Sequence, residues 1–293
     1  MTAQTNGNSN GTPSRKFENG VYTPLTTPMT EDEQVDIAAL RKQVVRLANA
    51  GMGIVLLGTN GEASHLMDHE RESVIKASRE ALDSAGHQNV PLLVGTGGGS
   101  AKHTIALAEQ AKAAGADYSI VICPGYFAFA MGSNKDAVKG FFKEVLDHSV
   151  LPVMIYNFPD IMYPGMAVGM TGSITGTGTW GLFAFQTKLR DLSSVRKGNI
   201  IPKTMVKLYN VGKRAIDTGD REAKDEALDL HRRVAAADWI VVKAGISGTK
   251  LALDTFVEKG LGGVPRKPLP RATEDTVKLV EDLRPFWEYE STL

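Results

Sequence analysis

The residues best suited to chemistry lie in a glycine-rich turn and in a short motif much further along the chain. The turn reads Gly58-Thr-Asn-Gly61-Glu62 and follows an apolar, β-branched run that ends at Leu57. The later motif, Ile155-Tyr156-Asn-Phe-Pro159, also closes an apolar run. The turn places a hydroxyl, an amide and exposed backbone N–H groups just beyond a strand, at the end where α/β folds bind ligands.

The elements that must position these motifs form an alternating pattern. We expect strands at 20–25, 54–57, 92–95, 118–122 and 153–156, separated by amphipathic helices at 36–50, 68–84, 101–114 and 135–147. Strands joined through helices imply parallel βα units, and five in a row without a polar edge strand favour a TIM-type (β/α)8 barrel. A doubly wound sheet is the alternative. Further helices are expected at 201–218, 220–237, 239–258 and 273–289.

The two motifs resemble those of the dihydrodipicolinate synthase and N-acetylneuraminate lyase family, in its fungal-type form, from about Gly20 to the end of the chain. Members are class I lyases and aldolases that hold pyruvate or a related 2-oxo acid as a Schiff base on lysine. The resemblance implies reversible carbon–carbon bond formation between such an acid and an aldehyde. It implies no metal and no organic cofactor, and members are commonly homotetramers.

The resemblance also assigns roles to three hydroxyl groups. Tyr156 matches the tyrosine that relays protons over the Schiff base, and Thr59 matches the hydroxyl that links this tyrosine into the relay. Tyr126 matches the tyrosine that members reach across a subunit interface to complete it. The alternatives are a core or rim position for Tyr156 and an ordinary surface position for Tyr126.

The same comparison indicates how a substrate carboxylate is held. Asn60 stands where the family usually has a small hydroxyl or glycine, and its amide can still donate to a carboxylate. Gly58 and Gly61 would contribute turn N–H groups, and Ile174 matches the apolar eighth-strand position beside the oxo acid. Glu62 lies at an expected helix start, where a carboxylate is predicted to cap and orient rather than to catalyse.

The Schiff-base lysine has no counterpart in this sequence. In the family it follows the tyrosine by a few dozen residues on the sixth strand, yet 160–178 contains no lysine. The arginine that many members use for a substrate carboxylate is replaced by Ile161. Lys243 superficially mimics the sequence around the family's lysine, but it lies in an expected C-terminal helix. Fungal-type relatives carry the same sequence there in addition to their own catalytic lysine. Lys188 lies in the expected insertion, where the family has no catalytic lysine.

The strand count breaks at the same place. After the fifth strand, Pro164-Gly165 breaks the pattern and a glycine-rich stretch follows. In this stretch 172–175 resembles the family's eighth strand, so we expect strands 6 and 7 to be absent. We interpret 179–198 as an insertion, 1–19 as a disordered polar tail and 20–293 as one incomplete barrel domain. Such a barrel leaves strand edges unpaired and is expected to be marginally stable.

Composition excludes several other classes of function. Lysine and arginine total 33 and balance 33 acidic residues, so nothing favours nucleic acid or a membrane surface. One cysteine, no signal or transit pattern and no long apolar run predict a cytoplasmic protein. His65 and His69 share helical spacing without a third ligand, which argues against a metal site. A dinucleotide-type fingerprint at Gly176–Gly181 lacks its acid, because Asp191 is too close.

Three hypotheses remain. The chain is a class I lyase or aldolase that lacks its nucleophile, or it is a non-catalytic relative that binds a 2-oxo acid or partners an intact subunit. The third possibility is a faulty product, with a coding segment skipped before Ile161 and a non-coding one retained at 179–198.

Overall fold

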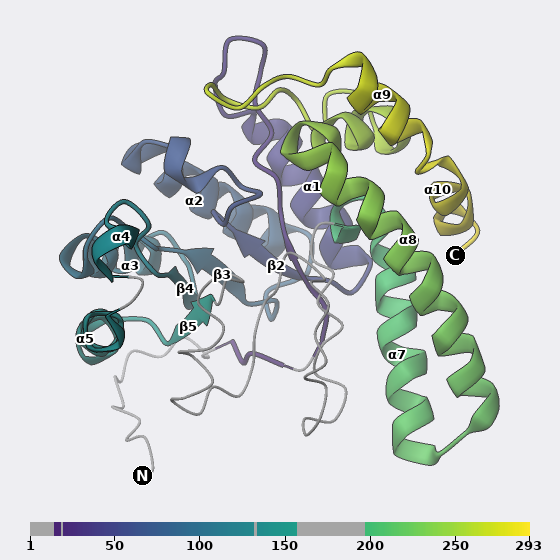
Figure 1. Cartoon of the computed structure of the whole chain (residues 1–293), viewed down its shortest axis with the longest axis horizontal. Coiled ribbons are helices and arrows are strands. Elements are labelled where there is room, and N and C mark those ends of the chain that lie inside the picture. Colours follow the sequence, from purple (N-terminus) through teal and green to yellow (C-terminus); the bar gives the residue numbers. More distant parts are fainter. Residues whose placement is uncertain (1–14, 19, 132–133, 157–196) are drawn as a thin grey trace.

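The computed structural model describes residues 15–18, 20–131, 134–156 and 197–293 (Figure 1). Within these residues, five parallel strands form one sheet in the order in which they occur along the chain. The strands are β1 (Tyr22–Pro24), β2 (Gly53–Leu56), β3 (Leu92–Gly95), β4 (Tyr118–Ile122) and β5 (Val153–Tyr156). All five agree with the predicted strands, and β1 and β5 form the edges of the described sheet.

Side chains alternate between the two faces of these strands, because successive Cβ atoms point to opposite sides. On β2, Ile54 and Leu56 pack with the helices in the main core, whereas Val55 faces the other way. Val55, Leu93 and Ile120 form a separate cluster on the inner face, and Met154 and Tyr156 pack against it. The sheet therefore has an apolar inner face as well as an apolar outer one, as the strands of a barrel do.

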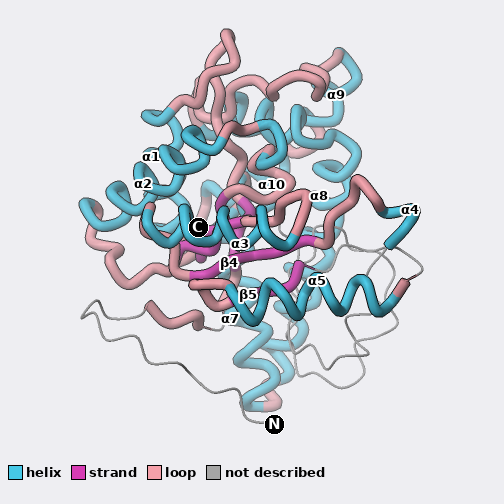
Figure 2. The backbone as a smooth tube through the Cα atoms, turned by 90° about the vertical axis from the view of Figure 1, so that its left-hand side faces the viewer, coloured by secondary structure: helices cyan, strands magenta, loops and turns pink. Residues whose placement is uncertain are grey.

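Helices cover the outer face: α1 (Ile37–Asn49), α2 (Asp68–Ser84), α3 (Ala101–Ala113) and α5 (Lys135–His148). The short α4 (Ala128–Met131) lies between β4 and α5 and has no buried residue. Asp36, Ser100 and Asn134 start α1, α3 and α5 by accepting a hydrogen bond from a backbone N–H of the first turn. Figure 2 shows α5 alongside β5, where Phe141, Phe142 and Val145 cluster with Val121 and Ile155.

The C-terminal third is helical, as predicted, but its divisions differ. Helices α7 (Pro202–Thr218) and α8 (Arg221–Ala252) form a hairpin, and a π-helical turn, η4 (Leu253–Val257), follows (Figure 1). The expected break near Asp238 is absent, and α8 instead kinks at Gly245, whose φ is 68°. The expected helix at 273–289 is divided into α9 (Glu274–Glu281) and α10 (Arg284–Ser291), with Pro285 at the start of the second.

Residues 15–18 correct the prediction of a disordered tail over 1–19. Arg15 donates to the Gln88 carbonyl at 2.6 Å and pairs with Asp117 at 3.1 Å. The ring of Phe17 stacks on Tyr22 with 4.7 Å between centroids. This segment therefore belongs to the folded domain, because it spans the amino ends of β1 and β4; residues 1–14 and 19 lie outside the described residues.

Residues 197–199, at the end of the expected insertion, belong to the folded domain. They form a single turn, η3 (Lys197–Asn199), that packs against β1, and a side chain at Gly198 would meet the Thr23 hydroxyl. Asn199 donates to the Pro24 carbonyl at 3.0 Å. The remainder of the predicted insertion, 179–196, lies outside the described residues. No helix in the described part of the chain is long and apolar enough to cross a membrane.

Candidate active site

The turn after β2 has a sharply defined backbone. Leu57 and Glu62 both adopt left-handed conformations, with φ of 55° and 53°, on either side of residues 58–61. The Glu62 N–H donates to the Thr59 carbonyl at 3.1 Å and the Ala63 N–H to the Gly58 carbonyl at 3.3 Å. The turn therefore folds back on itself at the carboxyl end of the strand, where the sequence predicts it.

Two glycines are required by close approach. A Cβ on Gly61 would lie 3.0 Å from the Leu57 nitrogen and 3.2 Å from the Leu25 carbonyl oxygen. A Cβ on Gly95 would lie 1.9 Å from the Leu57 carbonyl oxygen, so a side chain there would push β3 away from the turn. Thr27 adds a hydrogen bond from its hydroxyl to the Gly61 carbonyl at 2.8 Å.

The turn presents donors rather than acceptors. Within the part of the chain that the structure describes, the backbone N–H groups of 58–61 donate to no protein oxygen. Asn60 is 4% exposed, and its amide makes no hydrogen bond to the described residues. Successive free N–H groups and a carboxamide suit an anion such as a carboxylate.

Tyr156 and Thr59 occupy the predicted strand ends. Tyr156 ends β5 and lies half-buried on the inner face, against the cluster that includes Val55 and Leu93. Thr59 is exposed on the turn after β2, and β3 and β4 separate the two strands in the sheet. The structure therefore places both at the carboxyl edge, and the hydrogen-bonded relay between them stays a prediction.

Tyr126 lies on the loop that follows β4 and is 86% exposed. Its ring packs edge-on against Phe127, and Phe127 packs edge-on against Phe129. Phe127 and Phe129 are 54% and 83% exposed. This run of exposed aromatic side chains fits an interface position, but no partner residue is defined, so the donated role of Tyr126 also stays a prediction.

Glu62 does not cap a helix, contrary to the prediction. The short turn η1 (Ala63–His65) that follows it receives no side-chain cap from Glu62. One carboxylate oxygen of Glu62 pairs with Nζ of Lys250 at 2.5 Å, and the other accepts the Arg266 N–H at 2.8 Å. The side chains of Glu62 and Lys250 are both fully buried. Burial lowers the pKa of Lys250, and the Glu62 charge opposes that shift.

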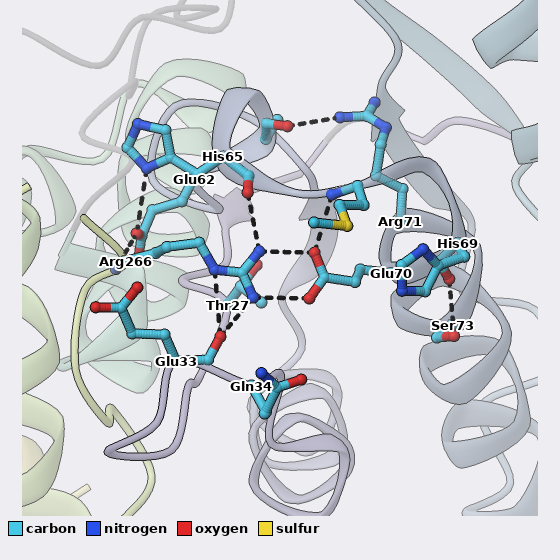
Figure 3. A network of polar contacts seen from close by, with 12 residues as sticks. Thr27, Glu33, Gln34, Glu62, His65, His69, Glu70, Arg71, Ser73 and Arg266 are labelled. Carbon is cyan, nitrogen blue, oxygen red and sulfur yellow. Dashed lines mark hydrogen bonds and ion pairs between the residues drawn. The ribbon is translucent and has the colours of Figure 1, made fainter. Parts of the chain in front are cut away.

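Arg266 extends this network across several loops (Figure 3). Its guanidinium binds both carboxylate oxygens of Glu70, at 2.6 and 2.7 Å. It also donates to the His65 carbonyl at 2.9 Å and to the Glu33 carbonyl. The hydrogen bonds from Arg266 lower the pKa of Glu70. The loops after β1 and β2 are thus tied to the C-terminal segment.

The sequence did not point to Lys250 or Arg266. One signal was present for Lys250, because it interrupts an apolar stretch of helix, and a lysine placed there needs a buried partner. Arg266 lies in a loop after α8, and its spacing from Glu62 and Glu70 follows no local period. Long-range ion pairs of this kind cannot be read from local pattern.

The remaining candidates have simpler outcomes. Lys243 is exposed on α8, with Nζ 5.0 Å from the centre of the Trp239 ring, and not at the end of a strand. Ile174, Ile161, Lys188 and the 176–181 fingerprint lie outside the described residues. Among the residues that are described, no cluster of three metal-binding side chains occurs.

Comparisons with known proteins identify relatives of this chain. A model described as the dihydrodipicolinate synthetase family matches residues 17–177. An L-threo-3-deoxy-hexylosonate aldolase of Hypocrea jecorina is 33% identical over 318 residues, covering 94% of this chain and 98% of the relative. A solved dihydrodipicolinate synthase family protein from Coccidioides immitis is 25% identical, with a TM-score of 0.77 over 95% of this chain and 99% of that chain. YagE from Escherichia coli K12, solved in complex with pyruvate, is 22% identical, with a TM-score of 0.67 over 91% and 98%.

Proposed function

Because the chain belongs to the dihydrodipicolinate synthetase family, we propose that it binds pyruvate or a related 2-oxo acid at the turn 58–61. We further propose that it forms no Schiff base at the family's lysine position, so its lyase or aldolase activity is impaired. The observation that carries the first part is the donor-rich turn: free N–H groups at 58–61 beside the buried Asn60 amide. A 2-oxo acid offers two acceptor groups, a carboxylate and the adjacent keto oxygen.

The absence of a nucleophile rests on the sequence and on the described lysines. No lysine occurs between 160 and 178. The alignment with the H. jecorina aldolase extends over 318 residues, more than the 293 of this chain, so that relative carries residues without a counterpart here. Near the turn, Lys250 is fully buried, with Nζ bound to Glu62 and to the Val264 carbonyl at 2.6 Å. An iminium on that lysine would have to displace both acceptors, since Schiff-base formation needs the free amine.

Binding of pyruvate, measured by ligand-observed NMR and by isothermal titration, tests this function. Asn60→Asp should weaken binding at least about tenfold, because a second carboxylate in the turn repels the ligand. Ser64→Asp is the control, since it adds the same charge at an exposed position just outside the turn. A wild-type chain that binds no pyruvate, or an Asn60→Asp variant that binds as well as wild type, would contradict the proposal.

A second candidate function is that of a partner for an intact subunit. The exposed aromatic run of Tyr126, Phe127 and Phe129 favours it, because such a patch on a soluble surface marks an interaction site. Under this proposal the wild-type chain sediments as a homo-oligomer or joins an intact relative, and Tyr126→Ser/Phe129→Ser sediments as a monomer. A monomeric wild-type chain that joins no relative would exclude this function.

A further inference from the structure

The turn 58–61 is held between two residues in an unfavourable conformation. Left-handed φ values are uncommon for residues other than glycine, and both Leu57 and Glu62 adopt them. Each such residue persists only where its surroundings determine it. Leu57 is fixed by its place at the end of β2, where its carbonyl lies against Gly95. Glu62 needs a separate anchor.

That anchor is the ion pair with Lys250. Its side chains are both fully buried, and the nitrogen and oxygen are 2.5 Å apart. A buried pair of this kind gives little net stability over apolar side chains, because both charges lose their hydration. It does, however, fix one geometry, since any displacement of Glu62 would leave the Lys250 ammonium buried without its counter-charge. The Arg266 N–H holds the second carboxylate oxygen at 2.8 Å.

We propose that Lys250 and Glu62 are positioning residues for the turn 58–61. Their ion pair joins the C-terminal helical segment to this turn, so that the N–H groups of residues 58–61 stay arranged for a carboxylate. This inference rests on the proposed function above. In this proposal neither Lys250 nor Glu62 contacts the ligand, and Lys250 acts only through Glu62. The C-terminal segment thereby becomes part of the binding site without contributing a ligand contact.

The test compares Lys250→Met and the double variant Glu62→Gln/Lys250→Met with wild type. Lys42→Met is the matched control, because Lys42 makes an exposed ion pair with Glu258. Hydrogen exchange is followed at the amides of residues 62 and 63, which bond to Thr59 and Gly58. In both test variants these amides should exchange about tenfold faster, while the amides of β3 exchange as in wild type. The pyruvate dissociation constant should rise about tenfold, and Lys42→Met should change neither quantity.

Several results would overturn the inference. One is an unchanged exchange rate at residues 62 and 63 in the double variant. This variant has no unpaired buried charge, so it can still be measured if Lys250→Met alone does not fold. Another is faster exchange at residues 62 and 63 with an unchanged pyruvate dissociation constant, because the ion pair would then hold the turn without affecting ligand binding. If wild type binds no pyruvate, the proposed function fails. The exchange rates then still decide whether the pair holds the turn, and unchanged rates would overturn that step too.

Discussion

Arg266 is the residue whose loss should most affect the stability of the loops around the turn. Its guanidinium makes two charge-assisted bonds to Glu70, at 2.6 and 2.7 Å, and also binds the carbonyls of His65 and Glu33. The two charged side chains are 14% and 12% exposed, so solvent screens the pair only in part. Arg266→Met keeps an unbranched, though shorter, side chain in place of the arginine stem and removes every one of these donors.

The expected cost follows from those contacts. Removing one partner of a buried ion pair costs about 3–5 kcal/mol, and partial exposure of this pair favours the lower end. The two carbonyls that lose a donor add about 0.5–1 kcal/mol each. We therefore expect Arg266→Met to lower the free energy of unfolding by about 4 kcal/mol, with about 2 kcal/mol of coupling to Glu70.

Urea denaturation of wild type, Arg266→Met, Glu70→Gln and the double variant gives this coupling directly. All four are measured in the same concentration of trimethylamine N-oxide, which strengthens burial and keeps a weak variant folded. Arg271→Met is the control, because Arg271 pairs with Glu31 at 56% and 80% exposure and should cost about 0.5 kcal/mol. A loss below about 1 kcal/mol for Arg266→Met, or no coupling to Glu70, would refute the reasoning.

Two further predictions concern the stability of the whole chain. Arg266 lowers the pKa of Glu70 from its ordinary 4.5, so the pair contributes fully above about pH 4.5 and its contribution is lost as the pH falls through the lower folded-state pKa. Between about pH 6 and pH 3 the urea midpoint of wild type should therefore fall more steeply than that of Glu70→Gln, and equal slopes would count against the ion pair. The sequence predicts that strands 6 and 7 are absent, which would leave strand edges unpaired. We therefore expect the chain to melt below about 45 °C, and a cooperative transition above about 65 °C would contradict a gapped barrel.

The sequence predicted the elements well where the local signal was strong. The strands β3, β4 and β5 begin and end at the predicted residues, because each is a short apolar run between polar or glycine-containing turns. The barrel-type fold and the family are confirmed by the comparisons. The predicted break near Asp238 was wrong, because no glycine or proline interrupts the helix there, and the kink occurs at Gly245.

The site was predictable only as far as local sequence reaches. The position of the turn and of Tyr156 at strand ends follows from the apolar runs that precede them. The helix cap predicted for Glu62 was wrong because its partners, Lys250 and Arg266, come from the opposite end of the chain. The cytoplasmic location and the oligomeric state stay predictions, because a single folded chain defines neither its compartment nor its partner.

Reductive trapping tests most directly whether the chain lacks a working amine. The protein is incubated with pyruvate and then with borohydride, and its intact mass is measured alongside that of a catalytically intact family member. We predict an unmodified mass for this chain and a reduced pyruvate adduct on the relative. A stoichiometric adduct on this chain, mapped to any lysine, would contradict this prediction.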